Sequence, residues 1–451
     1  MNLFVKDKNF YRGLLSIALP VALQQLILFG VSLADTVMVG MLGEVQLSAV
    51  SIANQLTFIF ILLSFGTGSG ASVLAAQYWG RKDVESIQKI MTVMYRIILV
   101  AGVFFTLLAV FFPRQVIAVF ITDLEVIEEG VKYLRIVGLS YLFMGVSITT
   151  IHLIRAVSIV KIALIVSTSS LVICAFLNWV LIFGNLGAPA LGVSGAAIST
   201  CIARVAEIII IAVYMIKYDK KIQYRLKMFF TRNLGMARKF LEAGMPVIIN
   251  ELIWGSGMAV IAVIIGRMGR EFTAANAICM VLAQLVTIAM FGVANASAVV
   301  IGNTVGAGEY EKAKEYARTI LAISFLLGLI GCVAVQLLKT PVIGFYNISP
   351  LAKEYARQII NVHSVVVIFV ALAANMMVGI LRGGGDTRFV LVIDIVFMWC
   401  ICIPLGAVAG LVLGLPVWLV YSILKTDEIL KVITALIRVL RGKWINDITI
   451  R

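Results

Sequence analysis

Long apolar stretches with almost no charged residues run through this chain from near its start to near its end. Charged and turn residues divide the sequence into twelve such stretches, and each exceeds the about 20 residues with which a helix crosses a bilayer. Folded in water, such a chain would expose large apolar patches, which soluble monomers rarely do. We expect spans near 12–39, 45–76, 88–112, 130–154, 161–184, 190–216, 237–265, 272–303, 314–338, 352–381, 388–413 and 415–438.

The composition supports this class and excludes others. The 451 residues are 61% hydrophobic and 13% charged, with a mean hydropathy of +1.05, whereas soluble domains are about 25% charged. Disordered chains need low hydrophobicity. We find no nucleophile–histidine–acid group, metal-ligand cluster or ATPase module in the sequence. We therefore predict an all-α polytopic membrane protein that is not an enzyme and needs no cofactor.

The net charge of +14 indicates topology rather than nucleic-acid binding, because basic residues gather in cytoplasmic loops. Counted from a cytoplasmic N-terminus, alternate loops place 28 of the 37 Lys and Arg residues on the cytoplasmic side and 8 on the other, with Arg204 inside a span. This bias predicts a multi-pass protein of the plasma membrane with both termini cytoplasmic. Its expected partners are the lipid bilayer and small molecules, with no nucleic acid.

The second half of the chain repeats the first at an offset of 226 residues. Pro20 matches Pro246, Gly80 matches Gly306, and one residue later in offset Arg155 matches Arg382. Each repeat holds six spans, an even number, so both have the same orientation, as in transporters whose parallel repeats are related by an axis along the membrane normal. We predict twelve transmembrane helices in two six-helix lobes related by a pseudo-two-fold axis. The boundaries are an N-lobe at 1–216, a basic cytoplasmic linker at 217–236, a C-lobe at 237–440 and a cytoplasmic tail at 441–451.

Two acidic residues inside spans are the first functional candidates, because a charge at such a position is costly. Asp35, in the outer half of its span, has no cation one turn away, so its carboxylate must take a proton, bind a cation or face water. Glu251, near the middle of its span, can exchange a proton or ligate a hard cation. We predict cation coupling for both, including a possible Na⁺ site. A wetted cleft position for Asp35 and a purely structural carboxyl group for either residue remain alternatives.

Other polar residues in the spans carry weaker signals. Glu207 lies three positions after Arg204, so the two are expected to form a satisfied pair on one helix face. Asp394 is expected to pair with loop arginines. His363 could titrate near neutrality, or it could be a buried hydrogen-bonded imidazole. The turn Arg382-Gly-Gly-Gly-Asp386 is interpreted as a basic cytoplasmic connector.

Several short motifs follow one another along nearly the whole chain. They are Ala18-Leu-Pro20, Asp35-Thr-Val-Met-Val-Gly40, Gln77-Tyr-Trp-Gly80, Phe176-Leu-Asn178-Trp-Val-Leu-Ile-Phe-Gly184, Leu191-Gly-Val-Ser-Gly195-Ala-Ala, Glu242-Ala-Gly-Met-Pro246, Gly302-Asn-Thr-Val-Gly306-Ala and Leu381-Arg-Gly-Gly-Gly-Asp386-Thr-Arg. Singly each is weak, but in this order they are specific. The chain resembles the multidrug and toxic compound extrusion (MATE) family.

The resemblance implies an antiporter that exports cationic amphipathic drugs and toxic organic compounds in exchange for Na⁺ or H⁺. It makes Asp35 the N-lobe carboxylate and Glu251 the C-lobe carboxylate. Some members have an Asp in the tenth span where this chain has Ala371, and others have an Asn and an Asp in the fifth span where it has Cys174 and Asn178. Since neither full set of ligands is present, the choice between Na⁺ and H⁺ stays open.

Transport by alternating access requires that the ion bind the two states of the protein with different affinity. An ion that binds Asp35 or Glu251 from outside would shift the arrangement of the two lobes toward the state that releases an organic cation outward. The protein is expected to function as a monomer. Substrate contacts should be apolar and aromatic, with a few polar anchors. The candidate anchors are Gln25, Asn178, Asn250, Gln284, His363 and Asn375. Two alternatives stay open, namely a lipid-linked saccharide flippase of the same superfamily and a membrane sensor that transports nothing.

Overall fold

The structure, a computed structural model, describes residues 4–231, 233–346 and 348–450, and it contains helices and no strand within these ranges. The all-α prediction is therefore confirmed. In the same ranges, eleven helical segments are long and apolar enough to cross a membrane. They are α1 (Lys8–Gly40), α2 (Glu44–Gly80), α3 (Val84–Phe111), α5 to α6 (Leu124–Ala156), α7 (Lys161–Phe183), α8 to η3 (Val193–Tyr218), α9 to α10 (Leu234–Arg267), α11 (Arg270–Gly306), α12 (Tyr310–Phe345), α13 to η5 (Pro350–Arg382) and α14 to η7 (Thr387–Val412).

A further helix, α16 (Val417–Leu440), completes the twelve predicted segments. Its apolar sequence is interrupted by the charged residues Lys425, Asp427, Glu428 and Lys431. Lys431 was counted among the basic residues of the cytoplasmic side, but its side chain is buried inside the helix bundle with 4% of the residue exposed. Its charge is therefore part of the interior and not of a loop.

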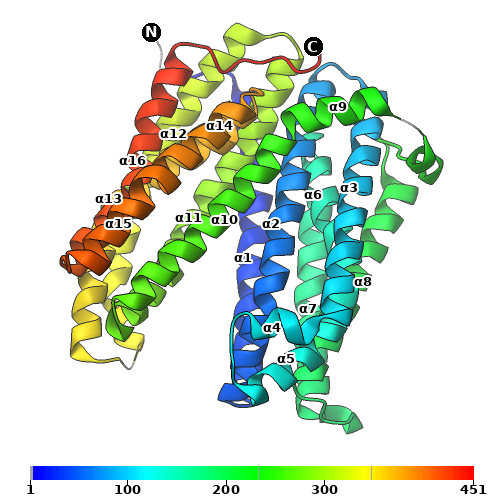
Figure 1. Cartoon of the computed structure of the whole chain (residues 1–451). Coiled ribbons are helices and arrows are strands. Elements are labelled where there is room, and N and C mark those ends of the chain that lie inside the picture. The colour runs from blue at the N-terminus through cyan, green and yellow to red at the C-terminus, as the bar shows by residue number, and fades with distance from the viewer. Residues whose placement is uncertain (1–3, 232, 347, 451) are drawn as a thin grey trace. The chain divides into compact units, whose positions relative to one another are not determined.

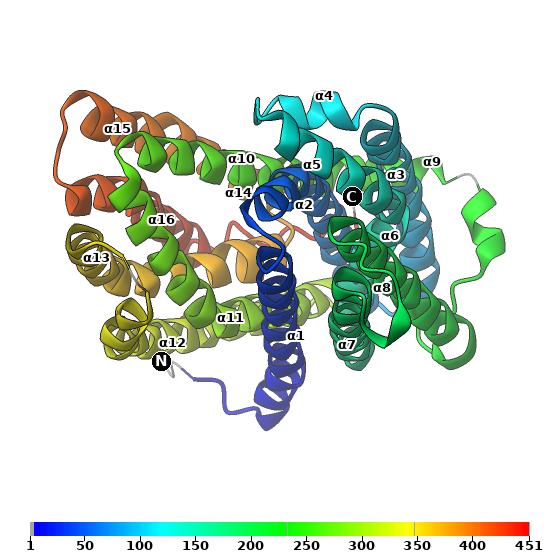
Figure 2. The ribbon, with the colours of Figure 1, turned by 90° about the horizontal axis from the view of Figure 1, so that it is seen from below.

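The helices form two compact units, each with its own apolar core. Unit 1 comprises Met1–Ala22, Ala76–Lys82 and Ile249–Arg451, and unit 2 comprises Leu23–Ala75 and Asp83–Ile248. In unit 2, α3 packs against α6 (Tyr141–Ala156) and α7 against α8 (Val193–Val213), as Figure 2 shows. In unit 1, α13 (Pro350–Ala374) contacts α11, α12 and α16. Because α1 and α2 contribute to both units, the units do not coincide with the two halves of the sequence, and the lobe boundaries stay a prediction.

Helix starts follow local chemistry. Asp83 caps α3 by accepting a hydrogen bond from the Ser86 amide at 3.0 Å, and Ser349 caps α13 ahead of Pro350 in its first turn. Such caps satisfy amide groups that have no partner inside the helix, and proline fits the first turn because its missing N–H is not needed there. These short connections let one span follow another with few intervening residues.

α2 and α11 approach each other within unit 1 at a pair of glycines. A Cβ atom at Gly80 would lie 2.1 Å from the carbonyl oxygen of Asn303, and a Cβ atom at Gly306 would lie 1.9 Å from the carbonyl oxygen of Gln77. Only glycine allows such an approach. Gln77 and Gly80 precede Asn303 and Gly306 by 226 residues, so the contact is reciprocal between repeat-related positions.

Residues 442–450, which we call the C-terminal strap, lie against the same end of unit 1. Trp444 is fully buried, and its ring lies 2.3 Å from where a Cβ atom of Gly384 would be. Asn446 donates its amide to the Gly384 carbonyl at 2.7 Å, and the Gln77 side chain bonds the strap at Asn446 (3.1 Å) and Ile448 (2.9 Å). The strap thus fixes the last turn of α2 to the Gly-Gly-Gly turn.

Both ends of the described chain lie at this end of unit 1 (Figure 1). The Val5 amide donates to Thr319 Oγ1 at 3.1 Å, and the Tyr310 hydroxyl donates to Asp447 Oδ2 at 3.0 Å, so both ends contact α12. An even number of spans requires the two termini to share one side of the membrane.

The ion pair between Arg81 and Asp447 should stabilise the strap only slightly. Its atoms are 3.0 Å apart, but 37% of the Arg81 side chain is exposed, and water and salt screen such pairs. Burial raises the pKa of Asp447, but hydrogen bonds from Thr449 and Tyr310 and the charge of Arg81 outweigh it and place the pKa below its usual value. A depressed carboxyl pKa stabilises the fold at neutral pH, and this contribution is lost as the pH falls into the acid range.

We expect Arg81→Gln to lower the free energy of unfolding by less than about 1 kcal/mol. Thermal unfolding in detergent at low and high salt checks this, because the loss should shrink as salt rises. Thr426→Ala, which removes a hydroxyl that donates to the Ser422 carbonyl of its own helix, serves as a neutral reference. A large loss that salt leaves unchanged would contradict the screened-pair account.

Candidate functional site

Asp35, on α1, lies in unit 2 next to two uncharged side chains of α7. The Asn178 amide nitrogen donates to Asp35 Oδ1 at 2.5 Å, and the Cys174 thiol donates to the same oxygen at 3.5 Å. Asn178 and Cys174 are four residues apart, so they project from one face of α7. Both are buried, whereas Asp35 is partly exposed. The predicted candidates Asp35 and Asn178 are thus brought together.

The surroundings leave the Asp35 carboxylate without an ion-pair partner among the described residues. Arg204, whose charge reaches Asp35, forms a 2.7 Å ion pair with Glu207 on α8, as predicted for that pair. Glu207 also accepts a hydrogen bond from Ser147 at 3.0 Å. Asn178 Oδ1 is buried and has no hydrogen-bond partner in the part of the chain that the structure describes. One carboxylate and one unused amide oxygen can therefore accept a proton or ligate a small cation.

Glu251, on α10 (Met245–Arg267), lies in unit 1 and is ion-paired. Arg382 Nη1 donates to Glu251 Oε1 at 2.7 Å, and Arg382 Nη2 donates to the Asn250 side-chain oxygen. All three residues are buried, with Arg382 4% exposed and Glu251 9% exposed. The sequence interpretation of Arg382 as a loop residue is wrong, because its guanidinium points into the bundle and neutralises Glu251.

Asn250 connects this pair to a second charged group. Its side-chain nitrogen donates to Asp394 Oδ2 on α14 (Thr387–Asp394) at 2.5 Å. The other oxygen of Asp394 is 2.7 Å from Lys431 Nζ, and Lys431 is also 2.8 Å from Asp427 Oδ2 on α16. Asp394 therefore pairs with a lysine of the last helix and an amide, and not with loop arginines as expected.

The two repeats share the framework of this arrangement. In unit 2, Arg155 Nη2 donates to Gln24 Oε1 at 3.0 Å, and Gln24 and Arg155 are the repeat mates of Asn250 and Arg382 at offsets of 226 and 227. Arg204 is likewise the mate of Lys431 at 227. Both repeats thus contain a buried contact between an arginine and a side-chain amide, and a cation on the last helix of the repeat. The carboxylates differ between the repeats.

The remaining predicted anchors are not gathered at one place. His363 Nδ1 is hydrogen-bonded to the Tyr421 hydroxyl at 3.0 Å, so its imidazole is buried and bonded. Asn375 is fully buried and donates to the Ala371 carbonyl of its own helix at 2.9 Å. Gln25 is partly exposed and Gln284 is exposed.

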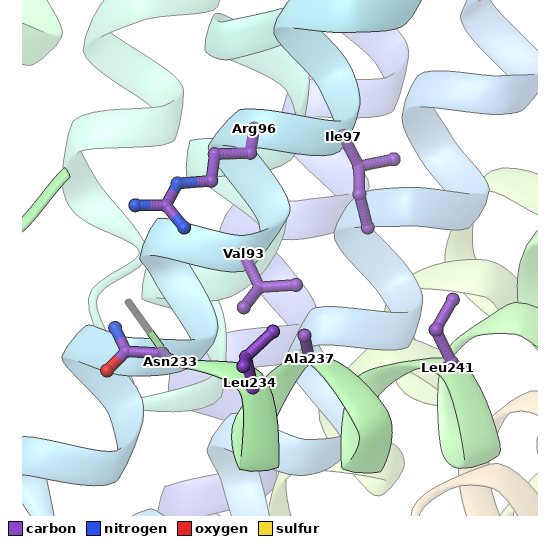
Figure 3. A pocket seen from close by; sticks show the side chains of 7 residues that line it. All are labelled: Val93, Arg96, Ile97, Asn233, Leu234, Ala237 and Leu241. Atoms are coloured by element: carbon purple, nitrogen blue, oxygen red, sulfur yellow. The ribbon is translucent and has the colours of Figure 1, made fainter. Parts of the chain in front are cut away.

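A surface pocket in unit 2 lies away from these residues. It has a volume of about 390 Å³ and opens between α3 and α9 (Leu234–Ala243), as Figure 3 shows. Arg96, its one charged side chain, is engaged by the carbonyl oxygens of Phe229 and Thr231. None of the predicted coupling or substrate residues lines it. The lining residues are Val93, Arg96, Ile97, Asn233, Leu234, Ala237 and Leu241.

Sequence reasoning missed Arg382, Lys431 and Asp427 as interior charges. Arg382 and Lys431 lie near the ends of apolar segments, where a linear count assigns basic residues to loops. The repeat contained a usable signal, because Lys431 is the mate of Arg204, which was already placed inside a span.

A family profile described as MatE matches the chain twice, over residues 20–180 and 246–408. The two matches start 226 residues apart, so the predicted internal repeat is confirmed. The chain belongs to the MatE family. This MatE protein is 26% identical over 418 residues to a probable multidrug resistance protein NorM of Agrobacterium fabrum, covering 90% of this chain and 88% of that protein.

The chain is also similar to a further relative and, in fold, to solved structures. The uncharacterized transporter YisQ of Bacillus subtilis is 23% identical over 418 residues, which cover 90% of this chain and 89% of YisQ. An outward-facing multidrug resistance MATE family transporter of the MOP superfamily has a TM-score of 0.86 at 18% identity, covering 97% of this chain and 99% of that one. A MOP superfamily transporter from Pyrococcus furiosus, described by the reverse polarity of its binding pocket, has a TM-score of 0.85 at 19% identity, with 96% of each chain covered. These structural likenesses concern the fold.

Proposed function

We propose that this MatE protein is a cation-coupled antiporter that exports cationic amphipathic organic compounds, including drugs, by alternating access. The proposal places it in the plasma membrane as a monomer. It places both termini in the cytoplasm, because most basic residues fall in the loops of that side. Several relatives carry the name of multidrug resistance proteins, which supports this class of substrate.

The observation that carries the proposal is the Asp35 carboxylate, which is hydrogen-bonded only by the uncharged Asn178 and Cys174 among its described side-chain contacts. A carboxylate in an apolar bundle is stable if it binds a proton or a cation, or if water reaches it. An ion bound at Asp35 and an organic cation carry charges of the same sign and repel each other. The binding of one therefore favours the release of the other. In this proposal Glu251 takes part in ion coupling through its ion pair with Arg382.

The test is ethidium efflux from pump-deficient cells that express the full chain. We expect Asp35→Asn to reduce efflux at least about tenfold, because the neutral amide cannot exchange an ion. A tenfold change corresponds to about 1.4 kcal/mol. Glu251→Gln should reduce it as well. The same cells are assayed after removal of Na⁺ and after collapse of the proton gradient, which identifies the coupling ion.

Asp83→Asn, a change at the partly exposed cap of α3, is the matched control and should leave efflux unchanged. Normal efflux in both the Asp35 and the Glu251 variants would contradict the assignment of these carboxylates. Absence of ethidium efflux from the wild type would contradict drug export itself.

A lipid-linked saccharide flippase is the second candidate, since Arg155, Arg382 and Lys431 are buried cations that could face a pyrophosphate. Arg382 and Lys431 are already occupied by carboxylates at 2.7 to 2.8 Å, which favours the export of organic cations. Counterflow of radiolabelled lipid-linked saccharide against ethidium in proteoliposomes separates the two.

A further inference from the structure

The linker between the two repeats, which belongs to unit 2, exposes large apolar side chains among its basic ones. Leu226 and Phe230 of η4 (Leu226–Phe230) are 78% and 82% exposed, and Leu234 at the start of α9 is 81% exposed. Groups of exposed apolar side chains mark sites that contact a partner or a membrane. We call this region the linker surface, and its exposed side chains are Arg225, Leu226, Lys227, Phe230, Leu234 and Leu241.

The linker is held in place by α3. Gln88 Nε2 donates to the Ile222 carbonyl at 2.6 Å, and Arg96 Nη2 donates to the Thr231 carbonyl at 2.7 Å. Gln88 and Arg96 are eight residues apart, about two helical turns, so α3 binds the linker along its length. Both η4 and α9 pack against α3. The exposed apolar side chains are therefore carried by an ordered segment and not by a free tether.

α9 has an apolar stripe along one side. Leu234, Ala237 and Leu241 follow one another at spacings of three and four residues, so they project from the same side, and all three line the pocket between α3 and α9. Arg238 and Glu242 are exposed and form a 3.0 Å ion pair. Figure 1 shows α9 lying across the end of α3. Amphipathic helices in this position lie in the membrane interface with their apolar side in lipid.

The pocket is polar on one side and apolar on the other. Figure 3 shows Arg96 and Asn233 on one side and Ile97 and Leu241 on the other. Two linker carbonyl oxygens bond Nη2 of Arg96, and because a guanidinium donates five hydrogens, these bonds leave three N–H groups for a further acceptor. Arg96 is partly exposed, and guanidinium groups are well suited to phosphate. A phosphate joined to an apolar chain matches both sides of the pocket.

The charge of the linker selects the kind of lipid. From Lys217 to Lys239 the sequence contains eight basic residues and one acidic residue, Asp219. The Asp219 carboxylate accepts hydrogen bonds from the Ile222 and Gln223 amides at 3.2 and 2.8 Å, so it serves the local turn. Basic segments next to a membrane span attract anionic lipids. α9 ends one residue before the span α10 begins, which places its apolar stripe near the bilayer and favours lipid over a soluble acidic protein.

We propose that the linker surface and the pocket between α3 and α9 bind an anionic phospholipid. Its phosphate contacts Arg96, one acyl chain follows Val93, Ile97 and Leu241 in the pocket, and Phe230 enters the surrounding lipid. The basic residues of the linker then select an anionic headgroup over a zwitterionic one. This inference goes beyond the proposed transport function and does not depend on the coupling ion or the exported compound. Only its assignment to the cytoplasmic leaflet rests on the proposed topology.

The first test is native mass spectrometry of the purified full chain in detergent with dioleoyl phosphatidylglycerol or dioleoyl phosphatidylcholine, which have the same chains. We expect wild type to bind the phosphatidylglycerol at least about tenfold more tightly, since each basic residue near the headgroup adds to the attraction. Arg96→Gln should remove most of this preference. Arg225→Gln with Lys227→Gln, which leaves the pocket intact, should also lower the phosphatidylglycerol affinity at least about tenfold. Arg114→Gln, an exposed change beyond the other end of α3, is the matched control and should have no effect.

The second test separates the acyl chain from the charge. Leu234→Ser with Leu241→Ser should weaken both lipids and keep their ratio, because the two leucines contact the chain and not the headgroup. Phe345→Ser, at a side chain that is 90% exposed at the end of α12, should change neither affinity. Glycerol 3-phosphate, a headgroup without chains, should not displace the phosphatidylglycerol.

Three outcomes would overturn the proposal. The first is equal affinity of the wild type for the two lipids, or a preference that the Arg96 variant and the Arg225–Lys227 variant both retain. The second is displacement by glycerol 3-phosphate, which would indicate a site for a free phosphate. The third is a mass of two chains that the leucine variant abolishes, which would assign the linker surface to a second copy of the protein.

Discussion

Arg382→Met should unfold or strongly destabilise the protein. The change leaves the Glu251 carboxylate and the Asn250 oxygen buried without the guanidinium that bonds both. Removal of one partner from a buried ion pair costs about 3–5 kcal/mol, a large fraction of the stability of a typical domain, which is about 5–15 kcal/mol. The amount of folded protein in membranes and its thermal unfolding in detergent measure the effect.

The double variant Arg382→Met with Glu251→Gln is the matched control for this prediction. With the carboxylate neutralised, no charge is left uncompensated, and apolar or neutral replacement of a whole buried pair is often tolerated. The double variant should therefore be more stable than Arg382→Met alone. Equal losses in the single and the double variant would show that Arg382 acts through packing and not through its charge.

Gly306→Val should have the second large effect, because a side chain at this position cannot be accommodated. A Cβ atom there would lie 1.9 Å from the Gln77 carbonyl oxygen, and both partners are backbone that cannot rotate away. Overpacking of this kind costs about 1–3 kcal/mol or more. We expect a lower thermal unfolding temperature and loss of efflux, since α2 and α11 must separate near the strap.

Gly80→Ala tests the same contact from its other side, where a Cβ atom would lie 2.1 Å from the Asn303 carbonyl oxygen. Gly80→Ala should also lower the thermal unfolding temperature and the efflux, but less than Gly306→Val. Gly266→Ala is the control, because no atom lies within 4 Å of the added Cβ, and it should be neutral. If the Gly80 and Gly306 variants unfold at the wild-type temperature, the two helices do not require the close approach.

The repeat and the interior acids could be derived from the chain alone for distinct reasons. Matched glycines and prolines at an offset of 226 are hard to produce by apolar composition, because these residues serve specific backbone conformations. Asp35 and Glu251 stand out because few charges interrupt the apolar runs, and Asp35 proved to lie beside Asn178.

The partners of these charges could not be derived in the same way. Arg382 lies 131 residues from Glu251 in sequence, and Lys431 lies 37 residues after Asp394. A linear pattern does not encode which side chains of separate helices meet. It also assigns a basic residue near the end of an apolar run to a loop, because long basic side chains usually reach the membrane surface there.

The sequence by itself determined that this protein is helical, spans a membrane, consists of two repeats and carries a few costly acids, because lipid forces every backbone group into a helix and makes each charge conspicuous. Only the tertiary structure decided which acids are neutralised. In the structure, Asp35 contacts uncharged side chains and Glu251 forms an ion pair with Arg382. Asp394 and Asp427 both contact the single lysine Lys431. The physical reason is that the state of a buried charge depends on groups within a few ångströms of it, and helix packing brings those groups together from distant parts of the chain.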